Sequence, residues 1–318
     1  MPYTTIDKSS DFFETVLYAG NSGTQSITSL DFQPDWCWFK ARNNTDTHAF
    51  FDSVRGVTKR IIPDNNSAEG TQSNGLTHFL SNGFTVGDAG IVNQGYNYVA
   101  WNWKESATAG FDICSWTGNG SAQNISHNLS KIPTMIIVKN RTDAGADWYV
   151  YNVHIGNTHS MILNTTTAKV GAYSDNWNNT TPTSSVFTVG SSNSTGGSSG
   201  DNMIAYVFTD IQGYSKFGTY TGNGNADGAF IFTGFKPAWV MIKKTDTADA
   251  WYMFDNKRQG FNPSNELLRA NLSNAESTPD RIDLLSNGFK LTDSDGSVNG
   301  SGGSYIYMAF AENPFVTS

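Results

Sequence analysis

Aromatic and amide side chains gather in one short segment of the chain, and their types are suited to binding a saccharide. The segment contains Tyr173, Asn176, Trp177 and Asn178. Aromatic faces stack on sugar rings, while amides hydrogen-bond to sugar hydroxyls. We treat these residues, with Tyr96 as a weaker addition from an earlier loop, as candidate contacts for a glycan or a host surface. The alternative is that Trp177 folds back onto its own domain and anchors its loop.

Catalytic chemistry finds little support in the residue spacing. The five histidines form no metal-binding pair of the His-Glu-x-x-His kind. Glu69 and Glu276 hold equivalent places in repeated segments, so they should lie a domain apart, whereas a glycosidase needs two facing carboxylates. We predict no catalytic residues and no enzymatic activity.

Metal and cofactor sites are also not predicted. The run Asp293-Ser294-Asp295-Gly296 resembles the opening of a calcium loop, but the closing glutamate is missing, so it is typical of a plain turn. Cys37 and Cys114 stand where other copies of a repeat carry Val, Ile or Gly. We therefore expect buried free thiols, with a disulfide as the minor alternative.

The elements that must position these residues recur three times along the chain. A Gly-Asn turn follows an aromatic strand at residues 20–21, 118–119 and 222–223. A proline then opens an apolar run at Pro34, Pro133 and Pro237, and these prolines are 99 and 104 residues apart. A period near 100 residues is too long for a solenoid and fits a small β-sandwich.

We therefore predict an all-β chain of three tandem β-sandwich repeats, jelly-roll or lectin-like, of about 100 residues each. The predicted parts are an N-terminal arm at 1–11 and repeats at 12–105, 111–210 and 214–313. Linkers of three to five residues leave little freedom, so the repeats should pack against each other. We expect seven or eight strands per repeat and one helical turn, at 265–270.

Each proline-led run is apolar throughout, which predicts a strand covered on both faces. The runs end at Lys40, Lys139 and Lys243. We expect these lysine stems to lie along apolar surface with the ammonium in water, and with Asp52 or Asp255 as possible ion-pair partners. Three loops rich in Gly, Ser and Asn precede the last strand of each repeat and are either binding loops or plain edge connections.

The charge and hydropathy of the chain exclude several partners. A net charge of −8 and a pI near 5.0 argue against nucleic acid, which selects basic surfaces. No apolar run of 18 residues is present, so no membrane-spanning helix is predicted. The first residues have neither the charged nor the apolar region of a signal peptide.

Several phrases of the sequence resemble an uncharacterised β-rich domain family found in virion proteins of tailed bacteriophages, especially marine and cyanobacterial ones. They include LYAGNSGTQSITSLDFQPDWCWFKARN, FDSVRGVTK, YVAWNWK and GYSKFGTYTGNG, and the resemblance covers about residues 3–316. Members are often labelled tail-fibre or structural proteins, sometimes with a lectin-like sandwich. The resemblance implies a location in the virion after assembly in the host cytoplasm, and it implies no particular site residues.

The functional expectation is a non-enzymatic virion surface protein, a tail-fibre or tail-associated component that contacts the host. One alternative is a capsid decoration or connector protein with a purely structural role. A second is a lectin-like carbohydrate-binding module. Expected partners are other virion proteins and a host surface glycan, and a triplicated chain could match one copy to each subunit of a threefold partner. The lack of heptads and of a stalk repeat argues against a long fibre.

Overall fold

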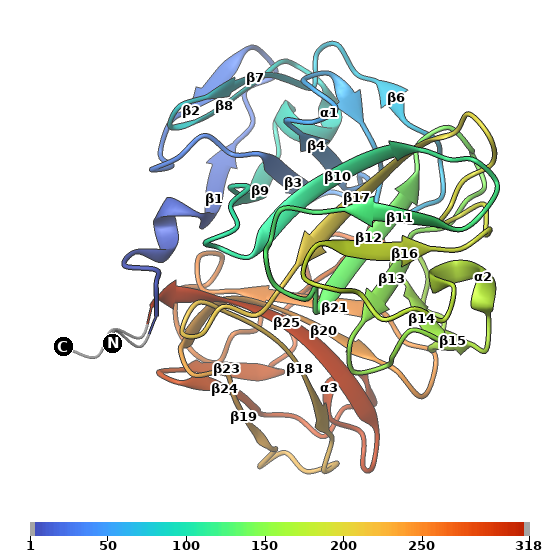
Figure 1. The fold of residues 1–318 in the computed structure, drawn as a ribbon. Helices are drawn as coiled ribbons and strands as arrows, with labels where there is room; N and C mark the ends of the chain where they lie inside the picture. The colour runs from blue at the N-terminus through green and yellow to red at the C-terminus, as the bar shows by residue number, and fades with distance from the viewer. Residues whose placement is uncertain (1–3, 315–318) are drawn as a thin grey trace.

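The computed structural model describes residues 4–314, and the chain in this range is all-β (Figure 1). We call residues 12–105, 111–210 and 214–313 units 1, 2 and 3. The strands of unit 1 are β1 (Phe13–Ala19), β2 (Gln25–Ile27), β3 (Trp36–Ala41), β4 (Ala49–Asp52), β5 (Lys59–Arg60), β6 (Gly70–Thr71), β7 (Leu76–Leu80), β8 (Gly83–Val86) and β9 (Asn97–Trp103). Those of unit 2 are β10 (Phe111–Thr117), β11 (Gln123–Ser126), β12 (Met135–Asn140), β13 (Tyr149–Asn152), β14 (His159–Ile162), β15 (Val170–Gly171), β16 (Val186–Val189) and β17 (Asn202–Phe208). Those of unit 3 are β18 (Ser215–Thr221), β19 (Phe230–Phe232), β20 (Lys236–Lys244), β21 (Trp251–Asp255), β22 (Leu268–Arg269), β23 (Ile282–Leu285), β24 (Gly288–Leu291) and β25 (Ser304–Asn313).

Helix is confined to single turns in the described residues. These are the 3-10 turn η1 (Ser9–Asp11) and the α-helical turns α1 (Gly90–Asn93), α2 (Ser174–Trp177) and α3 (Gly296–Asn299). The expected helical turn at 265–270 is wrong, because Leu268–Arg269 forms β22 and pairs with β21. Tertiary pairing has overridden the local helix preference of the Glu-Leu-Leu-Arg sequence there.

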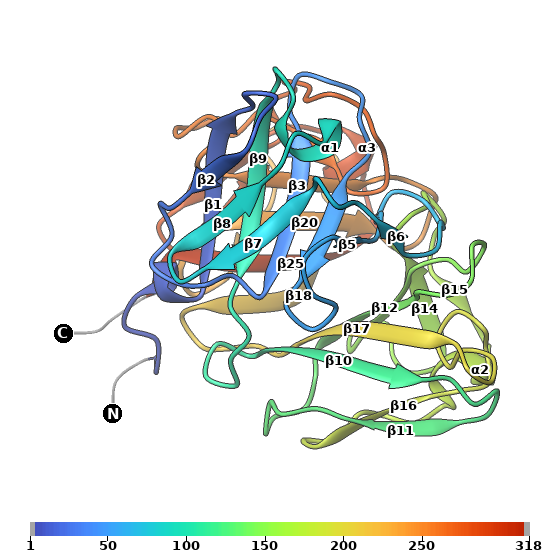
Figure 2. The same cartoon turned by 90° about the horizontal axis from the view of Figure 1, so that it is seen from above.

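The same strand order occurs in the large sheet of every unit. The orders are β1-β9-β3-β4, β10-β17-β12-β13-β14-β15 and β18-β25-β20-β21-β22, so the last strand always lies between the first and the third. All of these pairings are antiparallel. Smaller sheets, β2-β8-β7, β11-β16 and β19-β24-β23, accompany them. Figure 2 shows β11 and β16 lying outside the β10–β17 pair of unit 2.

The third strand of each unit is covered on both faces, as predicted. All six residues of β3 and of β12 are buried, and so are the central seven of β20. One face of each large sheet points to a small sheet, and the other points to the centre of the molecule. This double coverage explains why these strands are apolar without alternation.

The three units share one aromatic core. Trp36 of unit 1 stacks on Tyr206 of unit 2 with ring centroids 4.5 Å apart, and Trp103 meets Trp239 of unit 3 at 5.6 Å. Phe310 of unit 3 also lies in this buried cluster. The expectation that the units pack against each other is confirmed, and their packing is a fused core rather than a set of surface contacts. Units 1 and 2 each keep a second cluster between their large and small sheets.

The N-terminal arm packs onto this body over the residues that the structure describes. Ile6 is 1% exposed and belongs to the shared core, while Thr4 and Ser9 are buried beside it. Lys8 forms an exposed ion pair with Asp31 at 2.5 Å. Residues 4–11 are therefore part of the folded body.

Candidate functional site

The structure corrects the predicted role of Trp177. This side chain is 1% exposed, its indole Nε1 donates to the Ser160 hydroxyl at 2.8 Å, and its ring meets the edge of Tyr151 at 5.6 Å. Asn176 is 4% exposed. Neither residue offers its side chain to a ligand from solvent. Trp177 is the loop anchor of the alternative interpretation.

The other predicted contacts remain accessible. Tyr173 is 54% exposed and Asn178 is exposed on the same segment, where Asn178 adopts a left-handed backbone conformation that ends α2. Tyr96 is half-buried in unit 1, in the loop before β9. The predicted site thus loses its central aromatic ring and its residues divide between two units.

The loops before the last strands are tied down in units 1 and 3. Asn93 accepts a hydrogen bond from the backbone N–H of Asn21 at 2.9 Å and donates to the Gly87 carbonyl. Asn299 accepts from the N–H of Asn223 at the same distance. Both asparagines are 0% exposed. Each loop is therefore pinned to the Gly-Asn turn of its own unit, which favours a structural role.

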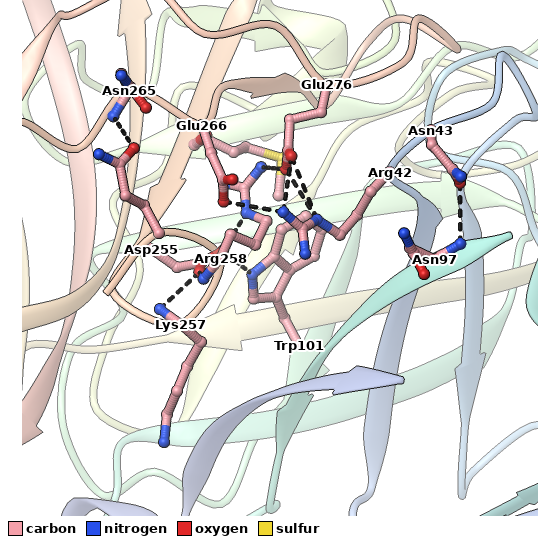
Figure 3. A network of polar contacts seen from close by, with 12 residues as sticks. Arg42, Asn43, Asn97, Trp101, Asp255, Lys257, Arg258, Asn265, Glu266 and Glu276 are labelled. Atoms are coloured by element: carbon pink, nitrogen blue, oxygen red, sulfur yellow. Dashed lines mark hydrogen bonds and ion pairs between the residues drawn. The ribbon is translucent and has the colours of Figure 1, made fainter. Parts of the chain in front are cut away.

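Charged side chains cluster instead at the boundary between units 3 and 1 (Figure 3). Arg42 of unit 1 contacts Glu276 and Glu266 of unit 3, each at 2.9 Å. Arg258 of unit 3 pairs with Asp255 at 2.6 Å and with Glu276 at 3.0 Å. The Arg258 and Asp255 side chains are 0% exposed, so this pair is buried, whereas the side chains of Arg42, Glu266 and Glu276 remain partly exposed.

The boundary between units 1 and 2 carries the same arrangement. Arg55 pairs with Asp52 at 2.5 Å and with Glu69 at 3.4 Å, and Glu69 pairs with Arg141 of unit 2 at 2.8 Å. The Tyr206 hydroxyl of unit 2 donates to Asp52 at 2.7 Å. At the boundary between units 3 and 1, Trp101 Nε1 of unit 1 donates to the equivalent carboxylate, Asp255, at 3.0 Å. Each network joins two neighbouring units through a glutamate held between two arginines.

Burial and pairing act against each other on the pKa values of these groups. Burial disfavours the charge on Arg55, but the Asp52 carboxylate outweighs it and raises the pKa of Arg55 above its usual range. Burial likewise opposes the charge on Glu69, but the hydrogen bond from Arg141 lowers the pKa of Glu69 overall. Both residues therefore carry their charge at neutral pH. Arg55 and Glu69 are thus parts of a structural ion cluster.

The boundary between units 2 and 3 departs from this pattern. One backbone hydrogen bond recurs at all three boundaries and shows which residues are equivalent. The N–H of Glu69 donates to Arg141 O at 2.8 Å, and the N–H of Glu276 donates to Arg42 O at 2.7 Å. At the boundary between units 2 and 3 the N–H of Lys169 donates to Thr245 O at 2.9 Å. Lys169 thus replaces the glutamate and Thr245 replaces one arginine. Asp52, Asn152 and Asp255 are equivalent, because each pairs with the same position of the third strand in its unit. Ile155 therefore stands where the other units have Arg55 and Arg258, three residues further on. This boundary has lost the network and gained a lysine.

A hydrogen bond from a ring nitrogen to a backbone carbonyl joins the two units at each of the three boundaries, at an equivalent place. Trp148 Nε1 donates to Ile62 O at 2.9 Å and Trp251 Nε1 donates to Ile162 O at 3.0 Å. His48 Nε2 lies 3.0 Å from Arg269 O at the third boundary. Unit 1 therefore contacts unit 2, unit 2 contacts unit 3 and unit 3 contacts unit 1, which closes a ring.

The three strand-ending lysines are not in water as expected. Lys40, Lys139 and Lys243 are 0% exposed, and each ammonium donates to backbone carbonyls, as Lys139 does to Ala146 O at 2.6 Å. Burial lowers the pKa of all three to about 8. The proposed pairing with Asp52 or Asp255 is wrong, because arginines hold those carboxylates.

A carboxylate pair occupies the junction between units 1 and 2. Burial, and then the hydrogen bond with Asp112, raise the pKa of Glu105 to about 8, while Asp112 also accepts from the Asn128 N–H at 2.6 Å. At the next junction the corresponding pair is Asp210 with Lys216, at 2.6 Å. The first junction therefore holds a proton between two acids where the second holds a salt bridge.

The remaining sequence candidates take structural roles. Arg281 contacts Asp293 and Asp295, and Asp295 caps α3 by accepting from the N–H of Ser297 at 2.8 Å. Cys37 and Cys114 are buried free thiols, as predicted. In the described part of the chain no group of three or more His, Cys, Asp or Glu side chains could hold a metal ion, and no helix is both long and apolar enough to cross a membrane.

The boundary networks were missed from the sequence, although a signal for them exists. Units 1 and 3 share the spacing Asp-x-x-Arg at 52–55 and 255–258, and unit 2 has Asn152 and Ile155 there. The sequence shows that Glu69 and Glu276 are equivalent, but it does not show that each pairs with an arginine of the neighbouring unit. Arg141 lies 72 residues from Glu69, so nothing local joins them.

A family model described as Domain of unknown function (DUF7483) matches residues 8–314 of the chain. A search of curated proteins gives no match.

Proposed function

Since the chain belongs to the family described as a domain of unknown function (DUF7483), and that description assigns no activity, we propose a function from the sequence resemblance and the form of the molecule. The protein is a non-enzymatic surface protein of a tailed-bacteriophage virion, a tail-fibre or tail-associated component that contacts the host. We interpret its three units as tandem β-sandwiches, jelly-roll or lectin-like in organisation.

The observation that carries this proposal is the closed ring around one aromatic core. Trp36, Tyr206, Trp239 and Phe310 come from three units and are buried together, so the units form a single rigid body. Binding functions commonly sit on the loops of rigid scaffolds. A virion protein that contacts a host meets this description, because it must present surface and withstand conditions outside the cell.

The threefold arrangement also supports a second candidate, a capsid decoration or connector protein. Equivalent bonds at His48, Trp148 and Trp251 relate the units by an approximate threefold repeat. A single chain of this form can sit on a threefold partner with one unit on each subunit. This role needs no host contact.

Gold-labelled antibody against the protein, applied to intact particles and viewed by electron microscopy, separates these roles. Label at the tail or its fibres supports the proposed host contact. Label spread over the head replaces it with the decoration role. Particles without label, from a preparation in which the antibody detects the protein in infected cells, would overturn the virion assignment.

A further inference from the structure

The boundary between units 2 and 3 contains a cleft of about 290 Å³. Its lining includes Ile155, Lys169 and Thr245, the three residues that replace the arginine–glutamate–arginine set of the other two boundaries. Isoleucine and threonine are much shorter than arginine. The cleft is therefore the space that two guanidinium groups and a carboxylate fill elsewhere in the same molecule.

The charge at this place is reversed. A glutamate stands at this backbone position in units 1 and 3, whereas Lys169 is exposed and makes no ion pair with any described residue. His154, also on the lining, bonds through Nε2 to Phe217 O at 2.9 Å. An anionic group entering the cleft would meet an unpaired ammonium, as the carboxylate of Glu69 meets Arg141 at the first boundary.

Hydroxyl groups line the wall beside this lysine. Thr219 and Thr221 of β18 stand opposite Ile306 and Ser304 of β25, and all four line the cleft. The hydroxyls of Thr219, Thr221 and Ser304 are exposed and take part in no hydrogen bond between described protein atoms. Unit 1 has Leu17 and Ala19 at the corresponding places of β1, whereas unit 2 has hydroxyl residues there, Ser115 and Thr117 of β10.

We propose that the cleft between units 2 and 3 binds a sugar residue that carries a carboxylate. Lys169 contacts the carboxylate, the hydroxyls of Thr219, Thr221 and Ser304 bond to the sugar hydroxyls, and the half-buried Ile155 covers the apolar face of the ring. Asp246 does not line the cleft, but it accepts from the N–H of the lining residue Ser304 at 3.0 Å. Its carboxylate can accept a hydrogen bond from a sugar hydroxyl but would repel a second carboxylate on the ligand.

The size of the cleft argues for one sugar residue in preference to a length of peptide. Ligand pockets span about 300–1,000 Å³, and this cleft, at about 290 Å³, lies just below that range. The carbonyl of Phe217 on β18 is already engaged by His154, which obstructs pairing of an added strand. The inference names a ligand class for the host contact proposed above and depends on that proposal only for its biological meaning.

Calorimetric titration of the full chain with sodium glucuronate, with glucose as the neutral counterpart, tests this site. We expect one saturable site for glucuronate and binding of glucose weaker by about tenfold, which corresponds to about 1.4 kcal/mol, because glucose has no carboxylate to pair with Lys169. Lys169→Gln should lower glucuronate affinity about tenfold, since the carboxylate loses its partner. Lys131→Gln, an exposed lysine in a loop of unit 2, should leave it unchanged.

A second variant keeps the test independent of small stability effects. Thr245→Arg restores the residue found at the other two boundaries and fills the cleft, so binding should disappear while the circular dichroism spectrum stays the same. Equal binding of glucuronate and glucose, or no binding of either, would overturn the proposal. Binding of sodium glutamate as tight as that of glucuronate would identify a site for protein carboxylates instead. Solution binding tests the cleft alone and particle labelling tests the virion role, so the two can fail separately.

Discussion

Trp38 donates its indole N–H to His48 Nδ1 at 2.7 Å, which leaves the ring proton of His48 on Nε2, facing Arg269 O of unit 3 at 3.0 Å. The ring is thus neutral and bridges two units. Burial, followed by the nearby Lys40 ammonium, lowers the pKa of His48 to about 3. Trp148 and Trp251 hold the equivalent places, and their rings do not titrate.

Replacing His48 should change how stability depends on pH. In the unfolded chain the histidine binds a proton near its ordinary pKa of 6.5, and in the folded chain only near pH 3. The unfolded state therefore binds more protons in this window, so stability falls as the pH is lowered from 6.5 towards 3, by up to about 1.4 kcal/mol per pH unit. His48→Gln should remove this part of the slope in urea unfolding measured from pH 4 to 7. An unchanged slope, or the same change in exposed His78→Gln, would contradict the account.

Removing one charge of a buried boundary network should be strongly destabilising. Arg55→Ile leaves Asp52 buried with only the Tyr206 hydroxyl as a side-chain partner from unit 2, and we expect a loss of about 3–5 kcal/mol in the free energy of unfolding. Unit 2 supplies the matched control, because it carries Asn152 and Ile155 at these positions. The double variant Asp52→Asn, Arg55→Ile should recover most of the loss in urea unfolding. Equal losses in the single and double variants would show that the charge balance is not the cause.

Trp177 should matter for folding rather than for ligand contact. Trp177→Ala removes a side chain that is 1% exposed and should cost about 3–5 kcal/mol, as other large-to-small changes in cores do. Tyr173→Ala, four residues earlier and 54% exposed, should change stability by less than about 0.5 kcal/mol. Thermal unfolding of both variants checks this. A Trp177→Ala protein as stable as the unsubstituted chain would contradict the anchoring role.

The acid pair between units 1 and 2 should give a slope of the opposite sign to that of His48. The pKa of Glu105 is raised from 4.5 to about 8, so the folded state binds the extra proton. The stabilisation from this group is complete below pH 4.5 and is lost as the pH rises towards 8. Glu105→Gln mimics the protonated acid and should flatten stability between these limits, as measured by urea unfolding at several pH values. An unchanged dependence would mean that Glu105 ionises in the folded protein at the same pH as in the unfolded chain.

The strands and their threefold repetition could be predicted because they depend on local patterns. Apolar residues without alternation, as in Trp36–Phe39, indicated a strand covered on both faces, and β3 is such a strand. Glycine and asparagine marked the hairpin turns. The helical turn at 265–270 was predicted wrongly, because pairing of β22 with β21 depends on residues in β21 that a local pattern does not contain.

The boundaries between units could not be predicted in the same way. Arg42 and Glu276 are 234 residues apart, and only the closing of the ring brings them together. The exposure of the strand-ending lysines was predicted wrongly for a related reason. The ammonium of Lys139 donates to a carbonyl in a loop of its own unit and, at 3.3 Å, to Asn66 O of unit 1. The sequence predicts that a polar side chain at the end of a buried strand faces solvent, whereas at a boundary it faces another unit.

The shared aromatic core means that the three units are not separable modules. A polypeptide of residues 12–105 alone would expose Trp36 and Trp103, which are at most 1% exposed in the full chain. Such a fragment could bury them only by joining two further copies around the same axis. The triplicated chain thus has the arrangement that three separate copies of one unit would have around a shared core, and we expect it to unfold in a single cooperative transition. Linking the copies also freed each boundary to diverge, which a symmetric trimer, with three identical interfaces, could not do.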